Sequence, residues 1–285
     1  MSEQLPAAYV HADTVDKAVE LVSADAETRV VAGGYSLLPQ VKDGIETPDR
    51  LVDVSRIDEL RGISHEAGET CIGALTTHHQ IATSDLVHEH VPALAEAADS
   101  VGDYQARQQG TIAGNLVFAD PKYDPPAAFL ALDGRVVARS PDGERTIGAD
   151  EWFCGPGETA LGPDEIVTDV AVPDAKRSSY VRTSEYSGYA IVGTAAALDV
   201  DGDAVASARV AVNGVKPFPI RLPNVEDELV GKHIDDELRF RAASAALRDI
   251  NLETLLMNGV VTDHQRLQLV RTYCRQAIER AIEGD

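Results

Sequence analysis

The sequence predicts an α+β protein of two domains, and three features predict it. The first 175 residues alternate short apolar, β-branched runs with stretches of helical spacing. Residues 180–212 hold three further apolar runs joined by tight turns, which is typical of an antiparallel sheet. A chain of 285 residues is long enough to build two hydrophobic cores.

The first lobe of the N-terminal domain is expected over residues 1 to about 57. Asp13 or Thr14 can cap a helix that runs to about Ala24. One side of this helix is apolar at helical spacing, through Val15, Ala18, Val19 and Val22. Two strands are expected after it, at 29–32 and 50–54.

The second lobe is expected over about 58–175. A short strand at 72–74 precedes a helix at 78–83, and Pro92 can open a helix to about Ala98. An alanine-rich helix at 125–132 is followed by a hairpin: a strand at 135–139, a turn at 141–143 and a strand at 144–147. A last strand at 165–172 ends at Pro173.

The polar segment 173–179 is the predicted linker, so the domains are expected to span 1–175 and 176–285. In the second domain three strands are expected, at 180–185, 190–200 and 204–212, the last two joined by Asp201-Gly202-Asp203. Two helical stretches follow. The last, at 263–282, carries an apolar stripe expected to cover the sheet: Leu267, Val270, Cys274, Ala277, Ile278 and Ala281.

Two glycine turns are the strongest functional signal. Residues 32–36 (AGGYS) follow one strand and precede a helix that Ser36 can cap, and 110–115 (GTIAGN) forms a second turn. Glycine lets a backbone approach a ligand and direct its N–H groups at an oxyanion, and Thr111 and Asn115 add a hydroxyl and an amide. Either turn alone is more often an ordinary turn. Together they predict a cradle for a diphosphate.

The chain is strongly acidic, with 47 Asp and Glu against 25 Lys and Arg and a net charge of −22. A diphosphate must therefore be bound by local, aimed donors, and nucleic-acid binding is disfavoured because no basic patch is present. Only six of the basic residues are lysines, a pattern typical of a halophile's surface. An acidic mesophilic surface is the alternative.

Cys71, Cys154 and Cys274 have no paired spacing, which excludes an iron–sulfur cluster or a structural zinc site made of cysteines; each is expected to be a small buried apolar residue. His78-His79 and His88 with His90 lack an accompanying carboxylate or cysteine cluster, so no metal site is expected. The start of the chain lacks the features of a signal peptide and no apolar run is long enough for a membrane span, so a cytoplasmic location is expected.

Seven segments resemble, in order, the FAD-binding medium subunit of molybdenum hydroxylases, the family of xanthine dehydrogenase and aerobic carbon monoxide dehydrogenase. The resemblance runs from about residue 5 to the end. Its segments are VVAGGYSLLP (30–39), LVDVSRI (51–57) with EL (59–60), IGALTTH (72–78), GTIAGN (110–115), ADP (119–121) with DPP (124–126), LGPDEI (161–166) and SGYAIVG (187–193). Ala113 stands where a second glycine is usual, and Phe118, where histidine is frequent, can stack on a ring or simply pack.

The resemblance implies a two-lobed FAD-binding domain of the PCMH type, followed by a C-terminal domain with a three-stranded antiparallel sheet. It implies that the two turns hold the diphosphate and that Asp124 accepts hydrogen bonds from the adenosine half. Leu161 and Ile166 would flank the isoalloxazine, with Tyr189 near it. Thr76 and Thr77 either bond the flavin or cap the next helix. The cofactor-binding set is Ala32, Gly33, Gly34, Tyr35, Ser36, Leu37, Thr76, Thr77, Thr111, Ile112, Ala113, Gly114, Asn115, Asp120, Asp124, Leu161, Ile166 and Tyr189, with no catalytic residue of its own.

The resemblance also implies partners. A molybdopterin-binding large subunit would oxidise the substrate, and a small subunit with 2Fe-2S clusters would pass electrons to the FAD of this chain, which would deliver them to a quinone or another acceptor. A dimer of such three-subunit units is expected, and chain length and motif spacing are closest to the carbon monoxide dehydrogenase type. Two alternatives stay open: a self-sufficient flavin oxidoreductase of the same fold superfamily, and a flavin-free assembly or interaction protein.

Overall fold

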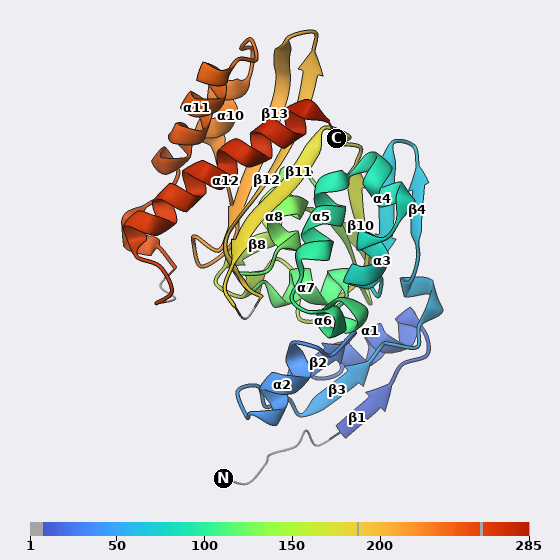
Figure 1. Cartoon of the computed structure of the whole chain (residues 1–285). Coiled ribbons are helices and arrows are strands. Elements are labelled where there is room, and N and C mark those ends of the chain that lie inside the picture. Colours follow the sequence, from blue (N-terminus) through green and yellow to red (C-terminus); the bar gives the residue numbers. More distant parts are fainter. Residues whose placement is uncertain (1–7, 187, 257–258, 285) are drawn as a thin grey trace.

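A computed structural model describes residues 8–186, 188–256 and 259–284 in three layers (Figure 1). Residues 1–7 and 285 of the predicted domains, and Ser187 of the 187–193 motif, lie outside the described residues. The N-terminal layer is a parallel sheet in the order β1-β3-β2. Its elements are β1 (Ala8–His11), α1 (Val15–Ser23), β2 (Thr28–Val31), α2 (Leu37–Lys42) and β3 (Arg50–Asp53).

Helix α1 confirms the sequence argument for the first lobe. The Thr14 hydroxyl accepts a hydrogen bond from the N–H of Lys17, so Thr14 and not Asp13 is the cap. The apolar stripe is buried against the neighbouring strands, through Val15, Ala18, Val19 and Val22. Strands β2 and β3 confirm the two predicted ones within a residue or two; β1, which the sequence analysis did not identify, pairs with β3.

The middle layer is a five-stranded antiparallel sheet in the order β4-β5-β10-β6-β7. Its strands are β4 (Ile63–Glu66), β5 (Glu69–Gly73), β6 (Arg135–Ser140), β7 (Gly143–Gly148) and β10 (Ile166–Pro173). The predicted hairpin is the pair β6 and β7. Strand β10 lies at the centre, where both of its faces are covered, and this explains its nearly continuous apolar sequence.

Short helices follow the middle sheet: α3 (His78–Ala82), α4 (Asp85–His90), α5 (Pro92–Ser100), α6 (Tyr104–Gln109), α7 (Ile112–Phe118), α8 (Pro125–Ala131) and α9 (Ala149–Trp152). A 3₁₀ turn, η1 (Asp58–Leu60), and a small ribbon of β8 (Phe153–Gly155) and β9 (Glu158–Thr159) complete the layer. The helices α3, α5 and α8 were predicted. The helix α7 was not, because the sequence analysis treated 110–115 as a turn.

The C-terminal layer is an antiparallel sheet of four strands, not the predicted three. Its strands are β11 (Ser178–Ser184), β12 (Ala190–Asp201), β13 (Ala204–Asn213) and β14 (Ile220–Arg221). The two residues of β14 are too few to show an alternating pattern, so only their pairing with β13 identifies them. The helices are α10 (Pro223–Leu229), α11 (Asp236–Ala245) and α12 (Asp263–Glu283), with 3₁₀ turns η2 (Ala246–Arg248) and η3 (Leu252–Thr254).

Helix α12 crosses one face of this sheet (Figure 1), as its stripe predicted. Leu267 is partly buried in the core and the other five stripe residues are fully buried. On the opposite face α5 and α8 pack against the sheet. The core of the middle layer therefore continues into the C-terminal sheet through Tyr180, Ala195, Ala197 and Ala211. The middle and C-terminal layers thus share an apolar interface.

The three cysteines differ in their exposure to solvent. Cys274 is buried as expected, Cys71 is half-buried, and Cys154 is exposed, so the expectation of a buried residue was wrong for Cys154. Among the described residues, the helices nowhere combine the length and the apolar character that crossing a membrane requires.

Candidate functional site

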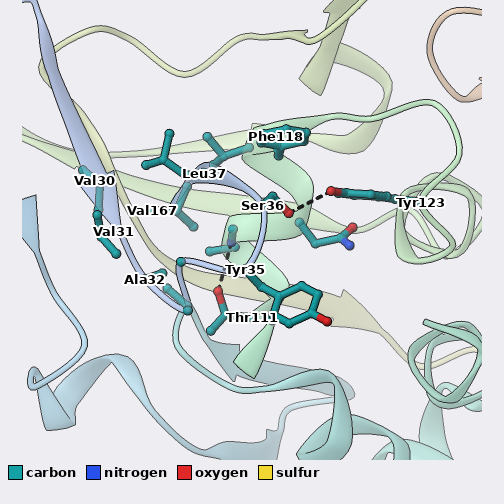
Figure 2. A pocket seen from close by; sticks show the side chains of 18 of the residues that line it. Val30, Val31, Ala32, Tyr35, Ser36, Leu37, Thr111, Phe118, Tyr123 and Val167 are labelled. Atoms are coloured by element: carbon teal, nitrogen blue, oxygen red, sulfur yellow. Dashed lines mark hydrogen bonds between the residues drawn. The ribbon is translucent and has the colours of Figure 1, made fainter. Parts of the chain in front are cut away.

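A cavity of about 820 Å³ opens between the N-terminal layer, the middle layer and the start of β12 (Figure 2). This volume lies in the range of about 300–1,000 Å³ found for ligand and cofactor sites. Fourteen of the eighteen predicted site residues line it: Ala32, Gly33, Gly34, Tyr35, Ser36, Leu37, Thr111, Ala113, Gly114, Asn115, Asp124, Leu161, Ile166 and Tyr189. Residues from five separate segments of the sequence thus meet at one place.

The first glycine turn, between β2 and α2, touches the approach to the second. A Cβ atom on Gly33 would overlap the carbonyl oxygen of Gln109, so only glycine allows this contact. Gly34 has φ of +69°, in the left-handed region that favours glycine. Within the described part of the chain, the N–H groups of Gly34, Tyr35 and Ser36 have no hydrogen-bond acceptor. The turn therefore offers free backbone donors to the cavity.

Ser36 occupies the N-cap position of α2, but its hydroxyl makes no capping bond. Instead it lies 2.7 Å from the hydroxyl of Tyr123, as Figure 2 shows. The predicted cap was wrong in this respect, because the backbone of Ser36 is already helical and directs the side chain away from the helix N–H groups. The Ser36–Tyr123 contact joins the N-terminal layer to the middle layer across the cavity.

The second turn forms the start of α7, and fewer of its backbone N–H groups are available to a ligand than the sequence predicted. The N–H groups of Ile112, Ala113, Gly114 and Asn115 donate to Thr76 O, Ala74 O, Thr111 Oγ1 and Thr111 O, respectively. These donors stabilise the turn itself, so its backbone offers little to a diphosphate. The Oδ1 atom of Asn115 is buried without a hydrogen-bond partner, and Asn115 lines the cavity. A ligand group that bonds this side chain would remove the cost of leaving it unsatisfied.

Three aromatic rings form a row at the cavity. Phe118 stacks on Tyr123 with ring centroids 5.7 Å apart, and Tyr123 stacks on Tyr189 at 6.2 Å. The Lys122 ammonium lies 5.4 Å from the centroid of Tyr189. Of the two possibilities for Phe118, it therefore stacks. The sequence analysis did not identify Tyr123 and Lys122; their position between Asp120 and Asp124, inside a motif already noted, was the available signal.

Asp124 is 3% exposed and already has protein partners. The Tyr180 hydroxyl donates to its Oδ1 at 2.6 Å, and Arg182 lies 3.5 Å from Oδ2. Burial raises the pKa of Asp124 to about 6, although the charge of Arg182 and the Tyr180 hydrogen bond lower it. Arg182 also donates to Gly188 O at 2.5 Å. The Asp124 cluster thus ties α8 to β11 and to the segment that carries Tyr189.

The far wall of the cavity is the loop before β10 and the strand itself, with Leu161, Ile166 and Val167. An ion pair positions this loop: Arg145 contacts Glu165 at 2.6 Å, and Glu165 also accepts a hydrogen bond from the N–H of Gly162 at 2.6 Å. The Arg145 hydrogen bond lowers the pKa of Glu165, so it remains ionised.

Four predicted site residues do not line the cavity: Thr76, Thr77, Ile112 and Asp120. Thr77 forms a capping box with Gln80 at the start of α3, which decides between the two roles left open for it. The Thr76 hydroxyl donates to Gly62 O, and the Ile112 side chain is fully buried. Asp120 accepts from the N–H of Lys122 and shapes the turn before Tyr123.

Two family models match the chain. Residues 4–175 match a family described as "FAD binding domain in molybdopterin dehydrogenase", and residues 182–281 match "CO dehydrogenase flavoprotein C-terminal domain". Together the two matches cover nearly all of the described chain.

Among curated proteins, the glyceraldehyde dehydrogenase medium chain of Sulfolobus acidocaldarius is 33% identical over 85% of this chain and 88% of its own length. The carbon monoxide dehydrogenase medium chain of Hydrogenophaga pseudoflava is 34% identical over 82% and 83%. A solved structure of the Hydrogenophaga pseudoflava carbon monoxide dehydrogenase, which lacks the Mo-pyranopterin moiety of the molybdenum cofactor, has a TM-score of 0.92 at 30% identity and covers 99% of this chain and 98% of that one.

Proposed function

The chain belongs to the family of FAD-binding domains of molybdopterin dehydrogenases, as a medium subunit of the carbon monoxide dehydrogenase and xanthine dehydrogenase type. We propose that it transfers electrons from iron–sulfur clusters of a partner subunit to an external acceptor such as a quinone. The observation that carries the proposal is the cavity in which the free amides of the first turn and the unpartnered Asn115 side chain meet.

The residues present fit FAD. The N–H groups of Gly34, Tyr35 and Ser36 would hold the diphosphate, and the unpartnered Oδ1 of Asn115 would accept a hydrogen bond from a hydroxyl or N–H group of the cofactor. These donors are local, so they can bind an anion although the whole chain has a net charge of −22. When bound, FAD supplies the redox chemistry that exchanges single electrons for electron pairs.

The apolar side of the site would receive the isoalloxazine. Leu161 and Ile166 line the far wall, and Tyr189, 44% exposed, stands at the opening, where it would limit access to one edge of the ring. Asp124 would contribute its remaining acceptor capacity to the adenosine half. Its carboxylate is held in place by Tyr180 and Arg182, so it is already oriented before the cofactor enters.

The proposed assembly follows from what the chain lacks. The three cysteines are scattered and free, so the clusters that deliver electrons must belong to another subunit. We propose a molybdopterin-binding large subunit and a 2Fe-2S small subunit as partners, in a cytoplasmic dimer of heterotrimers. The division into domains 1–175 and 176–285, with lobes at about 1–57 and 58–175, is part of the same proposal.

Gly33→Ala tests the cradle. The added methyl group would push the first turn away from Gln109 and misdirect its amides, so the dissociation constant for FAD should rise at least tenfold. The matched control is Gly148→Ala, because a Cβ on Gly148 meets nothing within 4 Å. Flavin absorbance retained after gel filtration at high salt, with circular dichroism to verify folding, measures the difference. Equal retention by both variants would show that this turn does not hold the cofactor.

The electron-transfer role needs a separate test. The isolated, FAD-loaded chain should not turn over small-molecule donors, whereas its flavin in the assembled complex should be reduced when the large subunit receives its substrate. Anaerobic absorption spectroscopy follows the flavin in both cases. Steady turnover by the isolated chain would favour the self-sufficient flavin oxidoreductase instead.

A further inference from the structure

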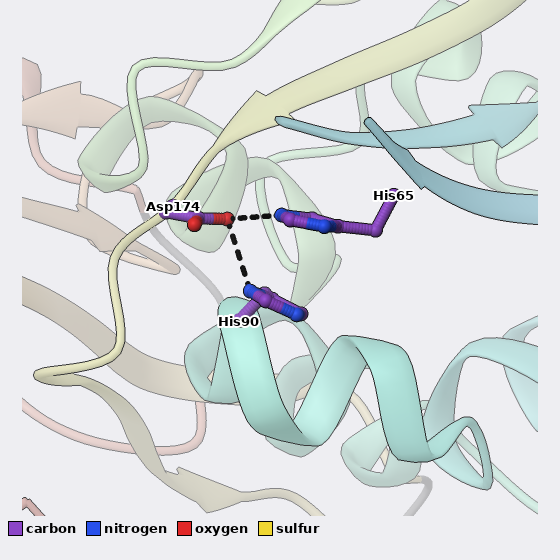
Figure 3. Close-up of side chains that lie close together, drawn as sticks. All are labelled: His65, His90 and Asp174. Carbon is purple, nitrogen blue, oxygen red and sulfur yellow. Dashed lines mark hydrogen bonds and ion pairs between the residues drawn. The ribbon is translucent and has the colours of Figure 1, made fainter. Parts of the chain in front are cut away.

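Two histidines and a carboxylate meet at the edge of the middle layer, away from the cofactor cavity (Figure 3). His65 comes from β4, His90 is the last residue of α4, and Asp174 directly follows β10. Their ligand atoms all lie within 4.8 Å of one another, and none of the three residues lines the cavity. No metal site was expected from the sequence, because no matching carboxylate or cysteine cluster accompanies His88 and His90; Asp174 is 109 residues from His65.

Both ring nitrogens lie near the same carboxylate oxygen of Asp174. Nε2 of His65 lies 2.8 Å from Oδ1 of Asp174, and Nδ1 of His90 lies 3.2 Å from the same oxygen. Donor atoms bound to zinc at about 2.0–2.1 Å in a tetrahedron lie about 3.3 Å from one another. The observed spacings are close to this value. For a cation to be bound by all three atoms, one imidazole must rotate out of the stack, because a metal ion lies in the plane of the ring that ligates it and the two ring planes are nearly parallel.

The Nδ1 atom of His90 lacks a hydrogen-bond partner, which indicates a ligand beyond the three side chains. It is buried and makes no hydrogen bond of normal geometry, although it lies near Asp174. The two imidazole rings are stacked, with centroids 3.6 Å apart and planes 14° from parallel. A divalent cation bound after one ring leaves the stack would give both ring nitrogens a partner.

Local charge favours a cation. Asp174 contributes a carboxylate to the site, whose ordinary charge is negative at neutral pH. Glu89 adds a second carboxylate 3.9 Å from Nε2 of His90. The side chains of His65, His90 and Asp174 are 21%, 12% and 33% exposed, which leaves room for water in the remaining coordination positions.

The cluster also fastens the connection between the two domains. The N–H of Asp174 donates to Gly68 O and the N–H of Ala175 donates to His90 O, both at 2.9 Å. The connection to β11 is thus held on one side by the β4–β5 turn and on the other by the end of α4. A cation bound by His65, His90 and Asp174 would join the same three elements through its ligands.

We propose that His65, His90 and Asp174 form a binding site for a divalent transition-metal ion of the zinc type, which stabilises the junction between the FAD-binding and C-terminal domains. Two imidazole nitrogens and one carboxylate oxygen are a ligand set that such ions prefer over Mg²⁺ or Ca²⁺. The proposal is independent of the flavin and of electron transfer.

Titration calorimetry of the FAD-loaded chain, made without a polyhistidine tag and freed of metal by a chelator, tests the site with ZnCl₂. One Zn²⁺ per chain should bind, and Tm should rise by about 5 °C when free Zn²⁺ exceeds the dissociation constant a hundredfold. Zn²⁺ affinity should be lower in acid than at neutral pH, because protons compete with the metal ion for its ligands. Co²⁺ should give the visible absorption of a four- or five-coordinate ion.

Each of His65→Gln, His90→Gln and Asp174→Asn should weaken Zn²⁺ binding at least tenfold and remove the rise in Tm. The matched control is His88→Gln, an exposed histidine on the same helix as His90, which should change the affinity less than twofold. Flavin content reports whether each variant is folded. Absence of stoichiometric Zn²⁺ binding to the wild-type chain, or binding that survives all three substitutions, would overturn the proposal and leave a hydrogen-bonded clamp.

Discussion

Gly33 and Thr77 illustrate what a single residue reveals through its sequence. Gly33 follows a β-branched strand and precedes a helix, so a tight turn could be predicted there; only the structure shows its contact with Gln109, which no other residue tolerates. Thr77 lies in an equally suggestive position, but its hydroxyl has two possible uses. Gln80, three residues later, fits the capping-box pattern, and the structure shows that Thr77 caps α3. Polar residues with a local and a distant partner within reach cannot be assigned from sequence alone.

The buried side chain of His78 makes the folding stability depend on pH. It is 1% exposed beneath the second glycine turn, where a Cβ on Gly110 would lie 3.0 Å from its ring. Burial lowers the pKa of His78 to about 4. The unfolded chain, with an ordinary imidazole pKa of about 6.5, binds a proton that the folded chain does not bind. Folding stability supplied by this residue is therefore complete above about pH 6.5 and is lost as pH falls toward 4.

Between pH 7 and pH 5 this effect should cost the wild-type protein about 1–2 kcal/mol of unfolding free energy. In His78→Gln the loss over the same interval should be smaller by about that amount, because glutamine does not titrate. Urea denaturation at both pH values, at constant salt, measures it. The exposed His88→Gln variant is the control and should follow the wild type. If the wild type and His78→Gln lost the same unfolding free energy between pH 7 and pH 5, His78 would have to be protonated in the folded protein at pH 5.

At the scale of elements, long periodic segments were predictable and short ones were not. Helix α12 has 21 residues and repeats its apolar positions over several turns, so its extent and its buried face were both correct. The strand β14 has only two residues, and α7 overlaps the glycine motif at 110–115, which was predicted as a turn. A turn that also opens a helix has the same sequence as a free loop, and here tertiary hydrogen bonds to Thr76 and Ala74 decide the outcome.

The start of α12 offers a test of element stability. Thr262 and Gln265 form a capping box, in which each side chain accepts a hydrogen bond from the other residue's N–H. Thr262→Ala removes one side and should reduce the free energy of unfolding by about 1 kcal/mol. Thr272→Ala, an exposed position within the same helix, should change it by less than about 0.5 kcal/mol. Urea denaturation compares the two, and equal losses would contradict a capping role.

At the scale of the whole molecule, the charge of −22 dominates. Between about 0.1 M and 1 M salt the Debye length falls from about 10 Å to about 3 Å, so repulsion among surface carboxylates is screened. Tm should therefore rise with KCl over this range, consistent with the predicted halophilic surface. Differential scanning fluorimetry measures it. An uncharged osmolyte of equal osmolality controls for solute exclusion, and a Tm that does not respond to KCl would contradict the electrostatic reading of the composition.

The sequence by itself determined the α+β class, the spans of the long elements, the position of the glycine turns and the family, because each of these depends on local pattern or on motifs in a fixed order. The tertiary structure alone decided which donors remain free. In the structure the N–H groups of Ile112–Asn115 are hydrogen-bonded and those of Gly34–Ser36 are not, Tyr123 contacts Ser36, and Asp124 contacts Tyr180. The tertiary structure also joined His65, His90 and Asp174. Hydrogen-bond satisfaction and side-chain convergence depend on distances between segments far apart in the chain, which no local pattern encodes.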